Sequence, residues 1–358
     1  MSEVLTSLPL ARLRFELKTR EASDVPPYKG DMLRMALLWW LSEFWCPEPQ
    51  RCRNGCRRPD VCMFGRLCEP VVDPNWSPQI RRLLGDTPPP AYALWDLQDR
   101  RTHFAAGDAW SFELTLTGEL VLRQIPAIIA AVQQGAESGM GRIRLRSSVQ
   151  RVGALVWSAA GTLEEHSLAA LETAQPAGVA DKPGPLLWQS YRVDGIALGL
   201  LQAVQWAERW ATPVQTLRID YLSPVKLKER GDWVETPEFS AVARALTRRL
   251  RILSEVYGGG EWPHAEYGPL LDLADNVRLE HHETHWLDYA RHSKQSGTYP
   301  VEGFVGPAWY TAEDFRPWLP VLWLGQWLHI GKGYVIGSGR YRLQINGNML
   351  TSGGEARG

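Results

Sequence analysis

One order of sequence patterns occurs twice along the chain, and this repetition constrains the fold more than any other feature. Leu13, Phe15 and Leu17 alternate with charged residues, which is the period-two pattern of a half-buried strand. The segments that follow are a helix over 31–45, strands over 91–97 and 109–116, a helix over 119–134, a glycine-rich turn over 135–142 and a strand over 143–148. This order is typical of the split-βαβ, ferredoxin-like arrangement.

The second half repeats the order. Leu217, Ile219 and Tyr221 again alternate with charged residues. The next segments are a helix over 237–257, strands over 277–283 and 302–310, a tryptophan-rich helix over 314–328, a glycine-rich loop and a final strand. Because internal repeats mark repeated architecture, we expect an α+β fold with two tandem ferredoxin-like (RRM-like, βαββαβ) domains. The predicted organisation is an N-terminal domain over 1–155 with a cysteine-rich insert over 46–70, a linker and connecting helix over 156–212, a C-terminal domain over 213–346 and a disordered tail over 347–358.

Charge and apolar content limit the partners of this chain. The 358 residues carry a formal net charge of −1, so a site for a polyanion must be a local patch. Seventeen tryptophans are present, and exposed ones can stack on nucleic-acid bases. No apolar run reaches the roughly 20 residues of a membrane span, and the amino terminus lacks the pattern of a signal peptide. We therefore expect a cytoplasmic protein with no membrane partner.

The glycine-rich loop near the end of the chain is the first candidate binding segment. It contains Gly331, Gly333, Gly337 and Gly339, interleaved with Lys332, Arg340 and Arg342. Glycine lets a backbone turn sharply and present consecutive N–H groups to an anion, and the basic side chains suit phosphates. The loop is predicted to bind a phosphate backbone; an ordinary glycine-rich hairpin is the alternative.

All five cysteines fall within 23 residues, at positions 46, 52, 56, 62 and 68. Four thiolates suit a structural zinc ion, which would hold together a segment with little core of its own. The predicted ligands are Cys46, Cys52, Cys56 and Cys62. Reduced structural thiols are the alternative, as is usual in a cytoplasmic protein.

Several of these segments resemble a known family. In the second half they are residues 217–226, the helix around 243–253, residues 286–293, residues 303–306 and the glycine-rich loop; in the first half they are 30–38, 62–70 and 137–142. The chain is similar to the RAMP superfamily of CRISPR-associated proteins, specifically to the endoribonucleases that cut precursor CRISPR RNA within its repeats.

The resemblance implies binding of a CRISPR repeat RNA hairpin and cleavage by attack of a 2′-hydroxyl on the adjacent phosphate. It also implies that catalysis requires no metal or other cofactor, and that other CRISPR-associated subunits of an interference complex can be partners. Two alternatives are a non-catalytic RNA-binding subunit and a backbone subunit that coats the guide region.

Catalytic residues in this family often come from the first helix and the loop before it, commonly with a histidine. This chain has no histidine before His103. Tyr28 and Lys29 occupy that neighbourhood and can supply an acid and a cation, but neither is an obvious base at neutral pH. The base can come instead from His285, His292 or His329, and for His329 a buried, backbone-bonded role is the alternative.

Two further arginine groups are expected to contact RNA. Arg244 and Arg248 lie four residues apart on one face of the helix over 237–257, and Arg142 ends the first glycine-rich turn. A solvated helix surface is the alternative for the first two. Contacts to phosphates rather than bases are expected, since the deep groove of A-form RNA hides the base edges.

Overall fold

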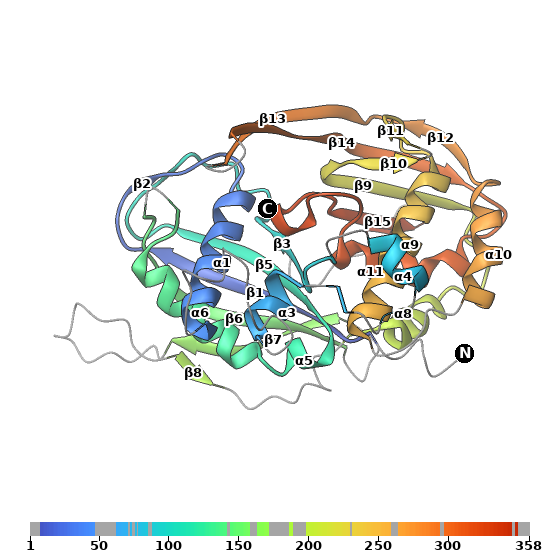
Figure 1. Ribbon diagram of the computed structural model, residues 1–358. Helices are drawn as coiled ribbons and strands as arrows, with labels where there is room; N and C mark the ends of the chain where they lie inside the picture. The colour runs from blue at the N-terminus through green and yellow to red at the C-terminus, as the bar shows by residue number, and fades with distance from the viewer. Residues whose placement is uncertain are drawn as a thin grey trace.

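Each half of the chain builds one large, six-stranded antiparallel sheet (Figure 1). This computed structural model describes residues 8–46, 62–70, 72–73, 76, 78–84, 88–141, 144–157, 163–171, 186–188, 198–229, 231–258, 264–293, 297–345 and 348–349. The predicted tail over 347–358 lies outside these ranges except for residues 348–349. None of the helices within the described ranges is long and apolar enough to cross a membrane.

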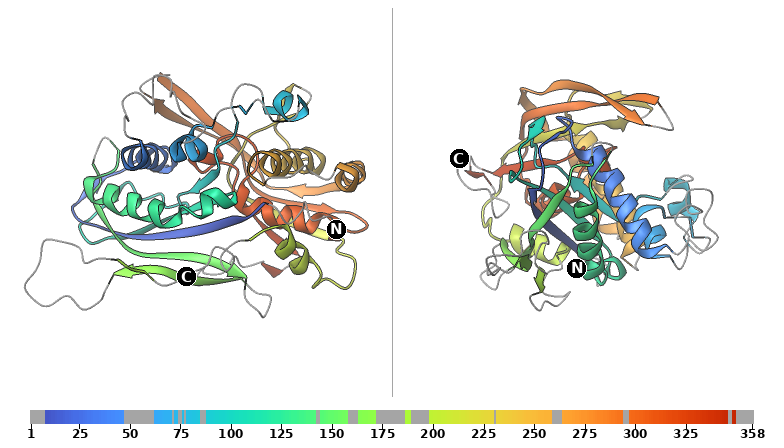
Figure 2. Two further views of the ribbon diagram at one scale, coloured as in Figure 1. Left: turned by 60° about the horizontal axis from the view of Figure 1, so that its bottom comes forward. Right: turned by 90° about the vertical axis from the view of Figure 1, so that its left-hand side faces the viewer.

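The first sheet is centred on β1 (Leu10–Thr19), which pairs with β5 (Ala109–Thr117) and β6 (Ser147–Trp157). The full order is β3 (Tyr92–Trp95), β5, β1, β6, β7 (Leu163–Leu171) and β8 (Leu186–Trp188). Helices α1 (Gly30–Trp45) and α6 (Ile125–Ser138) lie side by side over one face of this sheet (Figure 2). The alternation in β1 buries Phe15 against Phe112 of β5, with ring centroids 4.9 Å apart.

The second sheet has the order β12 (Arg278–His282), β14 (Gly297–Thr311), β9 (Thr216–Val225), β15 (Tyr341–Ile345) and β16 (Asn348–Met349). Strand β13 (His285–Ser293) pairs with the first part of β14. Helices α9 (Phe239–Tyr257) and α11 (Leu319–Leu328) contribute buried faces to its core. Tyr221 and Tyr310 share a buried hydrogen bond of 2.8 Å, so their polar ends are satisfied inside this core.

The remaining elements are short. They are β2 (Ser23–Asp24), α3 (Met63–Cys68), α4 (Pro78–Leu84), β4 (His103–Phe104), α5 (Glu119–Leu122), α8 (Leu200–Ala207), β10 (Leu227–Glu229), β11 (Asp232–Val234), α10 (His264–Ala274) and the 3₁₀ turns η2 (Arg316–Trp318) and η3 (Tyr334–Ile336). The pairs β2–β4 and β10–β11 form small sheets of two strands.

The four principal strands of each sheet follow the same spatial order. When these four strands are numbered along the chain, their order across each sheet is 2-3-1-4. The first sheet runs β3-β5-β1-β6, and the second runs β12-β14-β9-β15. The expectation of a mixed fold built from sheets and helices is confirmed.

Several segment assignments differ from the sequence expectation. The strand expected over 143–148 begins later, at Ser147, and β7 and β8 extend the first sheet beyond residue 155. Where the sequence predicts a glycine-rich turn from residue 135, helix α6 instead continues to Ser138. Gly135 lies within this helix, where it allows close packing against α1. A Cβ atom on Gly135 would lie 2.0 Å from the Trp40 ring of α1. Strand β13 was not predicted as a separate strand.

The two halves meet along a seam formed by the glycine-rich loop and α1. A Cβ atom on Gly30, the first residue of α1, would lie 1.8 Å from the carbonyl oxygen of Ile336 in η3. Gln98 Nε2, in the loop after β3, donates a hydrogen bond to the carbonyl oxygen of Leu222 in β9. Above the seam, β13 and β14 extend from the second half over the first (Figure 1). Tyr289 of β13 stacks there on Tyr28, with ring centroids 3.6 Å apart.

Candidate nucleic-acid interface

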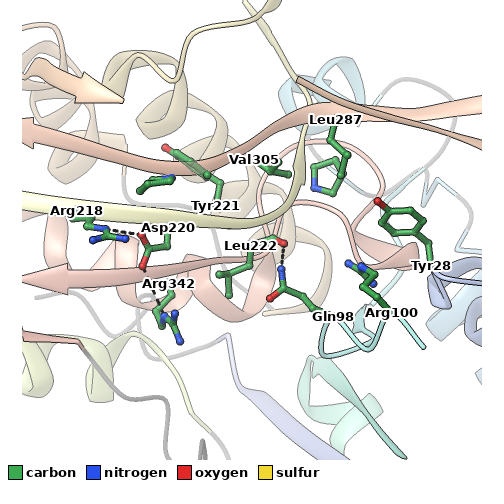
Figure 3. A pocket seen from close by; sticks show the side chains of 13 residues that line it. Tyr28, Gln98, Arg100, Arg218, Asp220, Tyr221, Leu222, Leu287, Val305 and Arg342 are labelled. Carbon is green, nitrogen blue, oxygen red and sulfur yellow. Dashed lines mark hydrogen bonds and ion pairs between the residues drawn. The ribbon is translucent and has the colours of Figure 1, made fainter. Parts of the chain in front are cut away.

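A pocket of about 420 Å³ opens at this seam (Figure 3). Both halves contribute to it through the loop before α1, the loop after β3, the middle of β9, the β13–β14 hairpin and β15. The lining residues are Tyr28, Gln98, Arg100, Arg218, Asp220, Tyr221, Leu222, Pro224, Leu287, Val305, Gly306, Pro307 and Arg342.

The pocket lining carries three arginines and one carboxylate, so its charge balance is positive. Arg218 Nε donates to Asp220 Oδ1 over 2.6 Å, and Arg342 Nε lies 4.0 Å from Asp220 Oδ2. Gln344 Nε2 donates to the same Oδ2 at 2.8 Å. Asp220 therefore orients two guanidinium groups without neutralising both, and such a site favours an anion with several oxygens.

Tyr28 lines the pocket and lies between two partners. Its ring stacks on Tyr289 with an interplanar angle of 3°, and the Arg100 guanidinium lies 4.4 Å from its centroid. Arg100 also donates to Asp96 Oδ2 over 3.0 Å. The structure therefore places Tyr28, a predicted acid, among the pocket cations.

Lys29 has a different environment from the one that the sequence suggested. Its side chain is buried, and Nζ donates to the carbonyl oxygens of Asp99 (2.5 Å) and Arg101 (2.8 Å). Burial lowers the pKa of Lys29, while Asp99 opposes that shift. Lys29 is not among the pocket residues: it fixes the loop that presents Arg100 to the pocket.

His329 is buried as well and bonded to backbone, which is the alternative role stated for it above, rather than exposed as a base would be. Its Nδ1 lies 2.9 Å from the carbonyl oxygen of Ser338, and its own φ is 60°. Burial, followed by the charge of Arg340, holds the pKa of His329 well below 6.5. A neutral imidazole that donates to Ser338 closes the base of the glycine-rich loop.

The other two candidate histidines lie on β13. His285 is exposed and pairs with Val305, a pocket residue. Since residues two apart share a strand face, His285 lies on the same face as Leu287, which also lines the pocket. His292 pairs with Thr298 near the end of the hairpin; its side chain lies outside the described part of the structure.

The glycines of the glycine-rich loop fold it back on the protein and do not leave its N–H groups open to an anion. Gly331, Gly333, Gly337 and Gly339 all have φ between 76° and 92°. The N–H groups of Lys332, Gly337 and Gly339 donate to the carbonyl oxygens of Lys226, Tyr334 and Pro224. These amides are already satisfied, so the expected backbone cradle for phosphate is wrong at these positions.

The basic side chains of this loop point to three different surroundings. Arg342 lines the pocket, and Lys332 is exposed beside Trp233. Arg340 is buried, with its guanidinium 4.7 Å from the Trp95 ring of the first half. Arg340 therefore belongs to the seam.

The arginines of α9 are held by contacts within the protein. Arg244 makes a two-pronged pair with Asp275 at 2.9 Å, and Arg248 donates to the carbonyl oxygen of Leu83 at 2.9 Å. These contacts connect α9 to its neighbours, so neither guanidinium forms part of an unpaired basic face. Arg142 lies outside the described residues.

Two of the four predicted zinc ligands can be placed. Cys46 follows the last residue of α1 and Cys62 precedes α3, and both are half-buried. Cys52 and Cys56 lie outside the described residues. Within the described ranges, no group of three or more His, Cys, Asp or Glu side chains could hold a metal.

Sequence reasoning missed Gln98, Arg100, Arg218 and Asp220. Arg218 and Asp220 alternate with the buried residues of β9, and Arg342 pairs directly with Asp220 across the sheet. The period-two pattern of the two strands could have located these three charges. Arg100 had no such signal, because the loop that carries it is fixed by the distant Lys29.

Comparison with known families agrees with this architecture. Residues 219–341 match the family model of the CRISPR-associated endoribonuclease Cas6, and residues 8–171 match a model of an N-terminal domain, AF_1859_N. No curated protein matches the sequence at a significant level.

Similar solved structures include a partial Cas6-RT-Cas1–Cas2 complex (TM-score 0.54, 11% identity, 97% of this chain, 48% of that chain). A Cas6-RT-Cas1–Cas2 complex also matches (TM-score 0.54, 11% identity, 97% of this chain, 30% of that chain). A Cas6 product complex matches as well (TM-score 0.51, 12% identity, 94% of this chain, 100% of that chain). The chain therefore spans about half or less of the first two proteins and all of the third.

The two sheets, with helices packed on them and the arginine-lined pocket between them, define a mixed α/β protein. Residues 219–341 of its second half match the CRISPR-associated endoribonuclease Cas6, and over these residues the resemblance to the repeat-cleaving CRISPR endoribonucleases is confirmed.

Proposed function

We propose that this chain is an endoribonuclease that binds the CRISPR repeat hairpin and cleaves precursor CRISPR RNA without a metal ion. The observation that carries the proposal is the pocket at the seam, where Arg100, Arg218 and Arg342 converge beside Tyr28. Two of these arginines project from β9 and β15, the central strands of the Cas6-type half. The common strand order of the two sheets supports tandem ferredoxin-like units as the platform for the RNA.

The chemistry needs three contributions from the protein. The substrate 2′-oxygen attacks the adjacent phosphorus, the bond from phosphorus to the 5′-oxygen breaks, and the products are a 2′,3′-cyclic phosphate and a 5′-hydroxyl. A base takes the 2′-hydroxyl proton, an acid protonates the leaving oxygen, and cations stabilise the charge that develops on the phosphorane. Since the nucleophile comes from the RNA itself, no metal-bound water is required.

We assign the cationic role to Arg218 and Arg342, whose guanidinium groups Asp220 holds in place. The Tyr28 hydroxyl is our candidate for the acid, because Tyr28 lines the pocket beside Arg100. His285 is our candidate for the base, because it shares the strand face of the pocket residue Leu287. Lys29 acts by positioning the loop that carries Arg100, and His329 acts by closing the glycine-rich loop that leads into β15 and Arg342.

A specific observation favours one alternative, a non-catalytic CRISPR RNA-binding subunit of an interference complex. Two of the residues suggested for catalysis, Lys29 and His329, are buried in contacts with backbone carbonyl oxygens. A protein that binds the hairpin without cutting it needs the pocket cations but neither acid nor base.

One assay separates the two functions. The protein is incubated in EDTA with its cognate repeat RNA and, separately, with the same RNA carrying a 2′-deoxy sugar at the cleavage position. The enzyme cleaves only the first and leaves a cyclic phosphate, and His285→Ala slows that reaction. Tight binding of both RNAs with no cleavage establishes the non-catalytic subunit instead.

Two further parts of the proposal concern cofactors and partners. We propose a structural zinc ion at Cys46, Cys52, Cys56 and Cys62; native mass spectrometry of the purified protein checks it, and a metal-free spectrum contradicts it. We also propose that other CRISPR-associated subunits bind the chain, since the similar solved structures include Cas6-RT-Cas1–Cas2 complexes. Co-purification from cells that express those subunits checks this.

A further inference from the structure

Trp233, on the short β10–β11 hairpin, is surrounded by three lysines. Its side chain is 43% exposed, which is unusual for so large an apolar ring. The Nζ atoms of Lys226, Lys332 and Lys228 lie 4.1, 4.8 and 5.5 Å from the ring centroid. We name these four residues the Trp233 cluster.

The cluster joins two segments that are distant in sequence and fixed to each other. Lys228 pairs directly with Trp233 across β10 and β11, so both side chains lie on one face of the hairpin. Lys332 comes from the glycine-rich loop, and its N–H donates to the carbonyl oxygen of Lys226 over 3.2 Å. A Cβ atom on the preceding Gly331 would lie 2.5 Å from that same oxygen, so the close approach requires glycine.

The charges of the cluster are not balanced locally. Among the described residues, only Lys226 has a carboxylate within ion-pair distance, that of Glu302. Burial, followed by the charge of Lys332, lowers the pKa of Lys226. Lys228 and Lys332 remain exposed. Three ammonium groups around one ring repel one another, and an arriving phosphate relieves that repulsion.

The acidic residues near Trp233 define which side is open to an anion. Glu229, Asp232 and Asp275 line a second, smaller pocket together with Trp233, and Asp275 pairs there with Arg244. Phosphates are repelled from that side. The lysine side, which continues into the glycine-rich loop, is the one available to a polyanion.

We propose that Trp233 stacks on an unpaired base of the RNA while Lys228 and Lys332 hold the adjacent phosphates. A base within a duplex has both faces covered, so only a single-stranded nucleotide can stack on this ring. Lysine side chains are flexible, so an arriving base can displace an ammonium group from the ring toward a phosphate. The inference rests on the proposed function and adds that the substrate has single-stranded nucleotides next to its hairpin.

Binding of a labelled, fully 2′-deoxy single strand of roughly eight nucleotides tests the proposal, because the probe cannot be cleaved. Fluorescence anisotropy in EDTA gives Kd as a function of salt for the full chain. The variants are Trp233→Leu, which keeps an apolar side chain, and the double variant Lys228→Gln/Lys332→Gln. The matched control is Trp39→Leu, which removes from α1 a tryptophan that is 52% exposed.

We expect Trp233→Leu to weaken binding roughly 10-fold or more at one salt concentration, as is typical for loss of one stacking contact. The lysine double variant should lower the slope of log K against log salt by about 1 to 2. Trp39→Leu should bind as the wild type does. Equal Kd values for the wild type, Trp233→Leu and Trp39→Leu overturn the inference and leave the proposed function intact. Failure of the wild type to bind any RNA, hairpin or single strand, overturns both.

Discussion

At the scale of single residues, burial decides what an ionisable side chain can do. His329 and Lys29 occupy sequence positions suited to catalysis, yet each is enclosed and bonded to backbone carbonyl oxygens. A buried imidazole that must stay neutral to donate to Ser338 cannot take up a substrate proton without breaking its own contact. The contribution of His329 is therefore measurable in the free energy of unfolding rather than in the cleavage rate.

The stability of the protein should depend on pH through His329. Its folded-state pKa is lowered below 6.5, so the unfolded chain takes up a proton first as the pH falls. The stabilisation is fully present above pH 6.5 and declines below it, by up to about 1.4 kcal/mol per pH unit. Denaturant unfolding at several pH values measures this decline. His329→Asn, which keeps a donor but does not titrate, should reduce it; an unchanged profile contradicts the assignment.

Arg218 should act on rate rather than on stability. Arg218→Gln removes one of the two guanidinium groups that Asp220 orients in the pocket. In the proposed reaction, the phosphorane would then lose charge stabilisation. We expect single-turnover cleavage at saturating RNA to slow by about 100-fold. Arg123→Gln is the matched control, since Arg123 forms an exposed pair with Glu119 on α5. Equal rates for the two variants would remove Arg218 from the mechanism.

At the scale of elements, glycines set the distances between neighbouring segments. Gly135 brings α6 against Trp40 of α1, and Gly30 brings α1 against the backbone of η3. Neither glycine forms a turn, which is the role that sequence reasoning usually gives to this residue.

Gly30→Ala should therefore destabilise the protein far more than the same substitution at a glycine with open space around it. Its Cβ atom would lie 1.8 Å from a carbonyl oxygen, so α1 must move away from the glycine-rich loop. We expect a loss of about 3 kcal/mol in the free energy of unfolding, measured by chemical denaturation. Gly268→Ala in α10, where a Cβ atom meets nothing within 4 Å, should be neutral or stabilise by up to about 1 kcal/mol. Similar losses in both variants would contradict the contact.

Periodic patterns explain which elements the sequence could predict. The alternation in β1 and β9 identified both central strands, and α9 and α11 were located within a few residues. The start of β6 was not, because the turn before it is closed by a bridge between Met140 and Leu145 that has no sequence signature. Strand β13 was missed because its polar residues lack a two-residue period.

At the scale of the whole molecule, the pocket exists only because two halves meet. Leu287 and Arg342 come from one half, and Tyr28 and Arg100 come from the other. Sequence analysis identified Tyr28 and Arg342 because local motifs marked them. It could not predict that a loop fixed by Lys29 would bring Arg100 to the same place, since that depends on tertiary contacts 70 residues apart or more.

The stack of Tyr28 on Tyr289 should hold the β13–β14 hairpin over the pocket. Tyr289→Leu removes the aromatic pair, which contributes about 1 kcal/mol beyond the buried area. We expect cleavage to become roughly five-fold slower at subsaturating RNA, because His285 and Leu287 are then less well positioned. Trp286→Leu, on the same hairpin and 40% exposed, is the control and should retain wild-type rates. Equal rates for all three proteins contradict the positioning role.

Residues near the N-terminal end of the first sheet complete the core of the second half. Leu8 and Leu10 are buried in the core of the second half, where Leu10 forms a backbone bridge with Leu198. The ribosome therefore releases these leucines long before their packing partners exist. One end of β1 therefore stays uncovered until the second sheet has been translated. A nascent chain stalled at mid-length would expose these leucines and would be a substrate for chaperones.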